Sequence, residues 1–258
     1  MNRRRVVCWF SCGAASAVAT KLTLRKYGPG RVVIAYTDPG SEHPDNQRFL
    51  ADCERWFGHP VVRLRSSEYT SAIDVWRRRK MIRLSHGGAP CTIELKKKVR
   101  FEFQRPDDIQ VFGYTAEEQR RADKFRQLNF DVLLETPLID AGLTKSDCLA
   151  MVERGGIVLP VMYLMGYRNN NCVGCCKGGI GYWNKIRRDF PEVFQDTAAL
   201  QRELNDPFWD HGQPLWLDEL DPNRGNHADE PNFECSLLCH LAEQDMERQG
   251  DAPPAPQL

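Results

Sequence analysis

The chain has 258 residues, 41% of them hydrophobic, which is long enough to bury a substantial core as one main domain with or without an appendage. Lys plus Arg and Asp plus Glu each number 35, and this balance excludes an overall basic field that would by itself indicate nucleic-acid binding. The longest apolar runs are far shorter than the roughly 20 residues that span a bilayer, so we expect no membrane segment. Ten cysteines without an export signal favour metal ligands or reactive thiols over disulfides, in a cytoplasmic protein.

The first half of the chain alternates short β-rich runs with helical patterns, which is typical of βαβ units and a parallel sheet. We therefore expect an α/β fold with a doubly wound, mostly parallel, Rossmann-like sheet of five strands. The strands are predicted at 5–10, 32–36, 61–65, 109–112 and 130–134, and the helices at 16–27, 45–56, 72–79, 91–103 and 116–128.

The second half changes in composition. Thr144 and Asp147 have capping-box spacing and predict the start of another helix. A loop rich in cysteine and glycine follows at 172–181, and then come two helical patterns at 182–188 and 192–204. We expect one nucleotide-binding domain over 1–204, including the Cys-rich loop, and a helical and irregular C-terminal extension over 205–258. Its last residues, 252–258, are expected to be disordered.

The loop Ser11–Ser16 lies between the first predicted strand and the first predicted helix. Its small residues leave backbone N–H groups open to an anion, and the helix dipole adds partial positive charge there. Ser16 offers a hydroxyl as well. The spacing is neither Gly-x-Gly-x-x-Gly nor a P-loop. A purely structural glycine turn is the alternative.

Four segments in chain order resemble the phosphoadenosine phosphosulfate reductase family, relatives of the ATP pyrophosphatases. Ser11–Ala17 is similar to the family's phosphate loop, and Asp38–Pro44 is similar to its Asp-Thr-Gly-x-x-x-Pro loop, with Pro39 in place of Thr. Pro90–Val99 resembles its cysteine-lysine helix, and Gly113–Arg121 its glycine-to-arginine segment.

The resemblance implies an adenine nucleotide alpha hydrolase-like fold with a purine nucleotide across the carboxyl ends of the strands. The nucleotide would be adenylyl sulfate, phosphoadenylyl sulfate or ATP. Ala15 stands where thiolating ATP pyrophosphatases usually carry Asp, which is closer to the sulfonucleotide reductases. A solvated helix face is the alternative interpretation of Lys96–Lys98. The implied nucleotide-binding residues are Ser11, Cys12, Gly13, Ala14, Ala15, Ser16, Asp38, Lys96, Lys97, Gly113 and Arg121.

Cysteines form a second constellation. Cys172, Cys175 and Cys176 lie in a loop of glycines and asparagines whose amides suit a cluster, and Cys91 is the best distant candidate for a fourth ligand. Four cysteines is the usual number for a [4Fe–4S] cluster. A structural zinc ion bound only by thiolates also needs four cysteine ligands. Three ligands with one free thiol, or a redox dithiol without metal, are further alternatives.

The C-terminal Glu234–His240 segment loosely resembles the Glu-Cys-Gly-Leu-His tail that carries the nucleophilic cysteine of sulfonucleotide reductases. Cys235 is the first catalytic candidate and Cys239 the second, because a thiolate near a basic side chain is a good nucleophile. A cysteine pair on a packing helix is the alternative. Cys8, Cys53 and Cys148 are expected to be core residues.

Three functions are compatible with these patterns. The first is thiol-dependent reduction of adenylyl sulfate or its 3′-phospho form, with a thioredoxin-like reductant as partner. The second is ATP-dependent sulfur transfer to a nucleic acid or small molecule, for which Tyr182 and Trp183 beside basic residues would stack on bases, unless they belong to a packing helix. The third is a non-catalytic sensor of nucleotide and cluster.

Overall fold

A computed structural model describes residues 4–83 and 88–230 of the chain. These residues form two compact units, each described here by itself. Unit 1 takes in the described residues of Met1–Asp38, Glu42–Arg65 and Val99–Asn170, and unit 2 those of Pro39–Ser41, Ser66–Lys98 and Asn171–Leu258. The expected boundary near residue 204 stays a prediction. Within the described ranges, the helices are all too short or too polar to cross a membrane.

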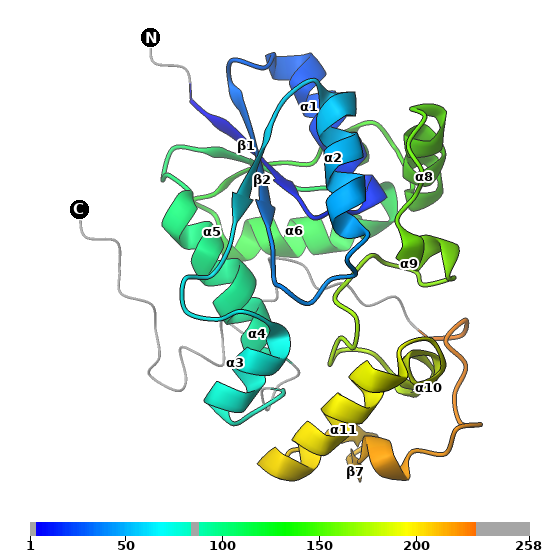
Figure 1. The fold of residues 1–258 in the computed structure, drawn as a ribbon. Helices are drawn as coiled ribbons and strands as arrows, with labels where there is room; N and C mark the ends of the chain where they lie inside the picture. The colour runs from blue at the N-terminus through cyan, green and yellow to red at the C-terminus, as the bar shows by residue number, and fades with distance from the viewer. Residues whose placement is uncertain (1–3, 84–87, 231–258) are drawn as a thin grey trace. The chain divides into compact units, whose positions relative to one another are not determined.

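Unit 1 is built on a five-stranded sheet in which every neighbouring pair is parallel, with strand order β3-β2-β1-β4-β5. The expected doubly wound α/β fold is confirmed. Figure 1 shows α1 and α2 on one side of the sheet and α6 on the other. The strands are β1 Val6–Phe10, β2 Val32–Thr37, β3 Val61–Leu64, β4 Ile109–Val111 and β5 Leu133–Glu135, and the helices are α1 Ala14–Tyr27, α2 Asn46–Phe57, α5 Lys98–Phe103, η2 Ala116–Glu118, α6 Gln119–Leu128, α7 Pro137–Asp140, α8 Lys145–Arg154 and α9 Val161–Leu164.

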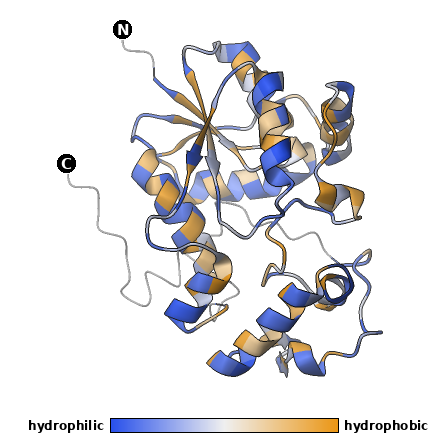
Figure 2. Ribbon diagram, viewed as in Figure 1, coloured by the Kyte–Doolittle hydropathy of each residue, from blue (hydrophilic) through white to orange (hydrophobic). Residues whose placement is uncertain are grey.

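Strand β1 is buried along its whole length because helices cover both faces of the sheet. Val6, Cys8 and Phe10 alternate onto the face that packs with α1 and α2 in the main apolar cluster. Trp9 lies on the other face, where its ring meets that of Phe103 at a centroid distance of 6.1 Å. In Figure 2, hydrophobic and hydrophilic residues alternate around the helices, as expected for helices with one face on a core.

One predicted strand was placed too early. The β-rich run 130–134 indicates a strand, but the structure has β5 at Leu133–Glu135 and leaves Phe130 92% exposed. The reason is register: Ile109 of β4 pairs with Leu133, so only the residues from Leu133 onward face a partner. The segment before it turns, with Val132 N–H bonded to the Asn129 carbonyl. The capping box at Thr144 and Asp147 is confirmed at the start of α8.

Unit 2 is mainly helical. Trp183 is fully buried and packs against Phe194 and Phe208, at ring-centroid distances of 6.3 and 5.3 Å. The antiparallel hairpin of β6 and β7 was missed from sequence, since its Pro- and Trp-rich strands show no period. The elements of unit 2 are α3 Ala72–Arg79, α4 Pro90–Thr92, the π-helical η1 Ile93–Lys97, α10 Ile180–Asp189, α11 Pro191–Leu204, β6 Phe208–Asp210, β7 Gln213–Leu215 and η3 Leu217–Glu219.

The start of α2 gives a pH-dependent prediction. Hydrogen bonds from Arg48, reinforced by the Val161 N–H, hold the pKa of Asp45 below its usual range. A carboxyl whose pKa is lower in the folded protein stabilises it above the unfolded pKa, and this is lost as pH falls through the folded pKa. We expect Asp45→Asn to lower the free energy of unfolding by about 1–2 kcal/mol at neutral pH. Urea unfolding should show the two proteins converging in acid, whereas Asp131→Asn, at an exposed site, should match wild type throughout.

Candidate functional site

The carboxyl ends of β1 and β4 form the switch point of the sheet. From β1 the chain proceeds to β2 on one side, while β4 pairs with β1 on the other. In open α/β sheets ligands bind in the crevice where connections diverge in this way. The loop Ser11–Ser16 leaves β1 here, and Gly113 follows β4. The predicted anion loop is therefore at the carboxyl edge where a nucleotide is expected.

The loop is held by its own serines. Ser16 Oγ accepts a hydrogen bond from the Ser11 N–H at 3.1 Å and donates one to the Gly13 carbonyl at 2.9 Å. Helix α1 starts at Ala14 with Gly13 as its N-cap, and glycine has no side chain to bond the first-turn N–H groups. The Ser16 hydroxyl thus shapes the loop, and the N–H groups of the helix start are what the loop presents to a ligand.

Gly113 is required by a close approach of backbones. A Cβ at this position would lie 2.8 Å from both the N and the Cα of Ser16. The loop after β4 therefore lies directly against the first turn of α1. Any side chain at residue 113 would push these two segments apart.

A chain of buried hydrogen bonds connects the two predicted nucleotide loops. Asn170 Nδ2 donates to the Cys12 carbonyl and to Asn46 Oδ1, both at 2.7 Å. Glu42 Oε2 accepts from Asn46 Nδ2 at 2.7 Å and from the Tyr36 hydroxyl at 2.8 Å. Burial, reinforced by the Glu42 charge, raises the pKa of Tyr36, so its hydroxyl stays a donor.

This arrangement fixes an unusual backbone. Cys12 has φ of 54°, a left-handed conformation that is uncommon outside glycine, and the bond from Asn170 holds its carbonyl. Sequence reasoning missed Asn170 because an Asn run reads only as a loop. Burial, followed by the Glu42 charge, raises the pKa of the Cys12 thiol well above its usual value, so this thiol is a packed side chain and no nucleophile.

Asp38 and Arg121 also belong to unit 1, and each has an ionic partner. Asp38 follows β2 and pairs with Arg65 at 2.9 Å. Arg121 pairs with Glu118, three residues earlier, and its guanidinium lies 5.3 Å from the centroid of the Tyr114 ring. Their predicted roles beside a nucleotide stay predictions.

Lys96 and Lys97 lie in unit 2, in the π-helical segment η1. Both are buried, so the interpretation of these two as a solvated helix face is wrong. Lys98, by contrast, is partly exposed and pairs with Glu94 at 2.7 Å. A π-turn holds one more residue than an α-turn, changes which side chains face inward, and is frequent at functional sites. An anion-binding role for Lys96 and Lys97 stays a prediction.

The four candidate ligand cysteines all belong to unit 2. Cys91 is the second residue of α4, and Cys172, Cys175 and Cys176 lie in the loop before α10. The Cys176 thiol is hydrogen-bonded with the thiols of Cys175 and Cys91. These bonds, with burial, raise the pKa of Cys176 well above its usual value. Two segments far apart in sequence thus bring three thiols together.

Tyr182 holds the cysteine loop in shape. The Cys175 N–H donates to the Tyr182 hydroxyl at 3.0 Å, and this hydroxyl donates to the Cys172 carbonyl at 3.3 Å. The Tyr182 ring also occupies the space where a Cβ of Gly178 would stand. Tyr182 is 3% exposed and Trp183 is fully buried, so the interpretation of this pair as a stacking platform for bases is wrong. They pack within unit 2.

Removal of the Tyr182 hydroxyl should loosen this loop. Tyr182→Phe leaves the buried Cys175 N–H without its acceptor, which costs about 1–3 kcal/mol. We expect a lower free energy of unfolding and faster reaction of the protein's thiols with a thiol reagent under native conditions. Tyr69→Phe removes a hydroxyl that bonds Glu68 elsewhere in unit 2 and should leave the thiol rate unchanged. Equal thiol rates in both variants would contradict the assigned role.

The remaining described cysteines agree with the sequence. Cys8, Cys53 and Cys148 are buried in the apolar cluster of unit 1, as expected. Burial raises the pKa of Cys8 and that of Cys148 to about 12, so both stay protonated at neutral pH. The catalytic candidates Cys235 and Cys239, and the segment 252–258 expected to be disordered, lie outside the described residues.

The donor chemistry of the thiol cluster suits a metal, because thiolates are the ligands of iron–sulfur clusters and of structural zinc. Across residues 4–83 and 88–230, no three or more His, Cys, Asp or Glu side chains are arranged as a preformed metal cage. What the structure shows is the Cys176 thiol in contact with those of Cys175 and Cys91. Metal binding there stays a proposal.

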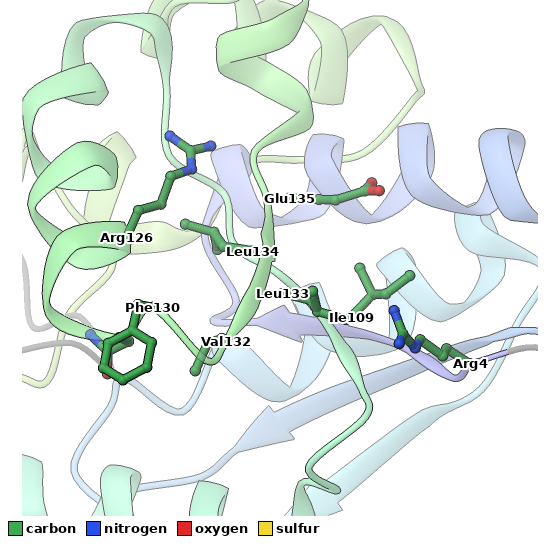
Figure 3. Close-up of a pocket in the computed structure, with 9 residues that line it drawn as sticks. Arg4, Ile109, Arg126, Phe130, Val132, Leu133, Leu134 and Glu135 are labelled. Carbon is green, nitrogen blue, oxygen red and sulfur yellow. The ribbon is translucent and has the colours of Figure 1, made fainter.

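A pocket of about 470 Å³ lies beside β5, the last strand of the sheet. Figure 3 shows its lining from β5, the turn before it, Arg126 of α6, the start of β4 and Arg4 ahead of β1. The lining includes neither Gly113 nor any residue of the Ser11–Ser16 loop. Its one carboxylate, Glu135, already accepts hydrogen bonds from Lys26 and Tyr27. This pocket is therefore separate from the candidate nucleotide site.

The fold and the loop after β1 define an α/β protein with a doubly wound parallel sheet. No family model matches the chain. Over 214 residues it is 22% identical to the uncharacterized protein MJ0066 of Methanocaldococcus jannaschii, a match that covers 78% of this chain and 42% of that protein. The chain thus spans less than half the length of this relative.

Proposed function

We propose that this protein binds an adenosine nucleotide at the Ser11–Ser16 loop and acts on sulfur, as a member of the phosphoadenosine phosphosulfate reductase family. The reaction is thiol-dependent reduction of adenylyl sulfate or its 3′-phospho form. The observation that supports nucleotide binding most directly is the start of α1 after this loop, where no side chain caps the first N–H groups. It lies at the switch point of the sheet and packs against Gly113.

The chemistry needs two thiols in succession. A thiolate, assigned to Cys235, attacks the sulfate sulfur; a bond between the two sulfurs forms, and the bond from sulfur to the phosphate oxygen breaks. The adenosine phosphate leaves. A thiol of a thioredoxin-like reductant then attacks the cysteine sulfur and releases sulfite, so that the two thiols supply two electrons and end as a disulfide. The amides of the Ser11–Ser16 loop would stabilise the negative charge on the leaving phosphate.

Cys91, Cys172, Cys175 and Cys176 would hold a [4Fe–4S] cluster, which would supply fixed charge to the reaction. Zinc is the alternative, and it draws support from the contact of Cys176 with two other thiols. Four thiolates on one zinc touch one another, whereas the irons of a larger cluster hold their ligands further apart. Iron, sulfide and zinc contents of an anaerobic preparation separate the two assignments.

The second candidate, ATP-dependent sulfur transfer, draws on the same nucleotide loop and the same thiols. A cluster held by three cysteines would leave one position for a transferable sulfur, and the loop before α10 alone supplies three, Cys172, Cys175 and Cys176. Burial of Tyr182 and Trp183 removes the stacking rings proposed for a nucleic-acid acceptor. Release of pyrophosphate from ATP only when RNA or DNA is added would favour this function over reduction.

The deciding experiment measures sulfite release from adenylyl sulfate and from its 3′-phospho form, with reduced thioredoxin or dithiothreitol as the thiol source. We expect sulfite from at least one of them and an adenosine phosphate in equal amount. Cys235→Ser should abolish release, and Cys148→Ala, at a buried core thiol, should not. Turnover of neither substrate by metal-loaded protein would overturn the reductase function.

A further inference from the structure

Tyr163 lies over the predicted anion loop. A Cβ at Gly13 would stand 3.3 Å from the Tyr163 hydroxyl and 3.7 Å from Ser11 Oγ. Two hydroxyl groups therefore flank the glycine at which α1 begins. Tyr163 belongs to α9, a segment to which sequence reasoning assigned no role.

Lys145 brings a positive charge to the same place. Its ammonium lies 5.9 Å from the centroid of the Tyr163 ring and donates a hydrogen bond to Asn169 Oδ1. Lys145 is the first residue of α8, where a cation is disfavoured by the helix dipole. Two carboxylates near Lys145 accept hydrogen bonds from the backbone. Asp147 accepts from the Thr144 N–H at 2.9 Å, and Glu117 accepts from the Lys145 N–H at 3.3 Å. Helix stability thus gives no reason for a lysine at this position.

A third group at the loop is Asn170, which is 6% exposed. Its amide nitrogen bonds the Cys12 carbonyl, so the amide stands against the loop. Its Oδ1 is buried and finds no hydrogen-bond partner among the described residues. Buried polar atoms are nearly always bonded in native proteins, which indicates that a donor, such as a water or a hydroxyl group of a ligand beside its anionic group, belongs at this point.

We propose that Lys145 and Tyr163 complete the anion site of the Ser11–Ser16 loop. The ammonium neutralises a phosphate or sulfate group held by the loop N–H groups, and the phenol donates a hydrogen bond to one of its oxygens. This inference rests on the proposed nucleotide site and narrows its ligand class: affinity comes from the anionic group, so nucleotides bind and uncharged nucleosides bind weakly. Lys145 and Tyr163 are then specificity-determining residues.

Calorimetric titration of the full chain with sulfate, AMP, adenylyl sulfate and adenosine tests this. Lys145→Met should weaken the three anions by about 10- to 100-fold, the factor expected for a lost hydrogen bond to a charged group, and leave adenosine unchanged. Its binding of AMP should also depend less on KCl concentration. Lys145→Arg should retain most of the affinity. Tyr163→Phe should show a smaller loss, again confined to the anions.

Lys26→Met is the matched control. Lys26 lies in the last turn of α1, about 18 Å along the helix from the loop at 1.5 Å per residue, and the substitution removes the same charge. An unchanged preference for AMP over adenosine in Lys145→Met, in a variant with a wild-type circular dichroism spectrum, would overturn the inference. If wild type binds sulfate but no adenosine nucleotide, the proposed function fails, while the sulfate series still decides the role of Lys145. If wild type binds none of the anions, both fail.

Discussion

Replacement of Cys176 by serine is expected to abolish the metal binding that we propose for this protein. Cys176 is the thiol that contacts both of its neighbours, Cys175 and Cys91, so it joins the loop before α10 to the start of α4. Loss of a group that merely orients a ligand weakens metal affinity by about 10- to 100-fold, and loss of a ligand itself weakens it further. Iron, sulfide and zinc analysis of anaerobically purified protein gives the readout.

Cys148→Ala provides the control for this prediction. Cys148 is equally buried but lies in the apolar cluster of unit 1, so its loss should reduce stability and leave metal content intact. If Cys176→Ser kept the wild-type metal content, the cluster of Cys91, Cys175 and Cys176 would have no ligand role. If Cys148→Ala lost the metal as well, general destabilisation would explain both results.

Gly113→Ala is expected to abolish nucleotide binding and to destabilise the protein. The added Cβ would lie 2.8 Å from the backbone N and Cα of Ser16, and backbone atoms cannot move aside as a flexible side chain can. Overpacking of this kind costs about 1–3 kcal/mol. It also displaces the first turn of α1, whose N–H groups are the proposed anion ligands. Titration with AMP and urea unfolding measure the two effects.

Gly30→Ala tests whether glycine loss alone matters. A Cβ at Gly30 would meet no atom within 4 Å, and Gly30 has no positive φ. This variant should bind AMP as wild type does. Wild-type AMP affinity in Gly113→Ala would contradict a nucleotide site at the switch point, whereas loss of affinity in both variants would point to a less specific cause.

The parts of the fold that sequence predicts are those set by local patterns. The period of apolar residues identifies β1 and α1, and small residues between them mark the loop for which we propose anion binding. The capping box at Thr144 works because its partners are three residues apart. The misplaced β5 shows the limit: its start is decided by pairing with Ile109, which no local pattern contains.

The candidate site follows the same division. Clustered cysteines can be recognised from spacing alone. The structure brings the Cys91 thiol to that of Cys176, whereas the role of Cys91 as a metal ligand stays a prediction. The supporting roles of Asn170 and Tyr182 could not be predicted from spacing. Each acts through a hydrogen bond to a backbone atom, the Cys12 carbonyl or the Cys175 N–H, and no sequence motif encodes such a bond. Such supporting contacts depend on three-dimensional packing.

The π-helical turn at Ile93–Lys97 has a consequence for how this region tolerates change in chain length. Successive residues of an α-helix are rotated by about 100° around the axis, so one surplus residue in a turn offsets everything before it by that angle. Deleting Ile93 would convert the π-turn into regular α-helix. It would also rotate the Cys91 side chain by about a quarter-turn around the helix axis relative to Lys98. The direction of the Cys91 side chain therefore depends on the number of residues in this segment. Point substitutions do not change that number, whereas a one-residue deletion does.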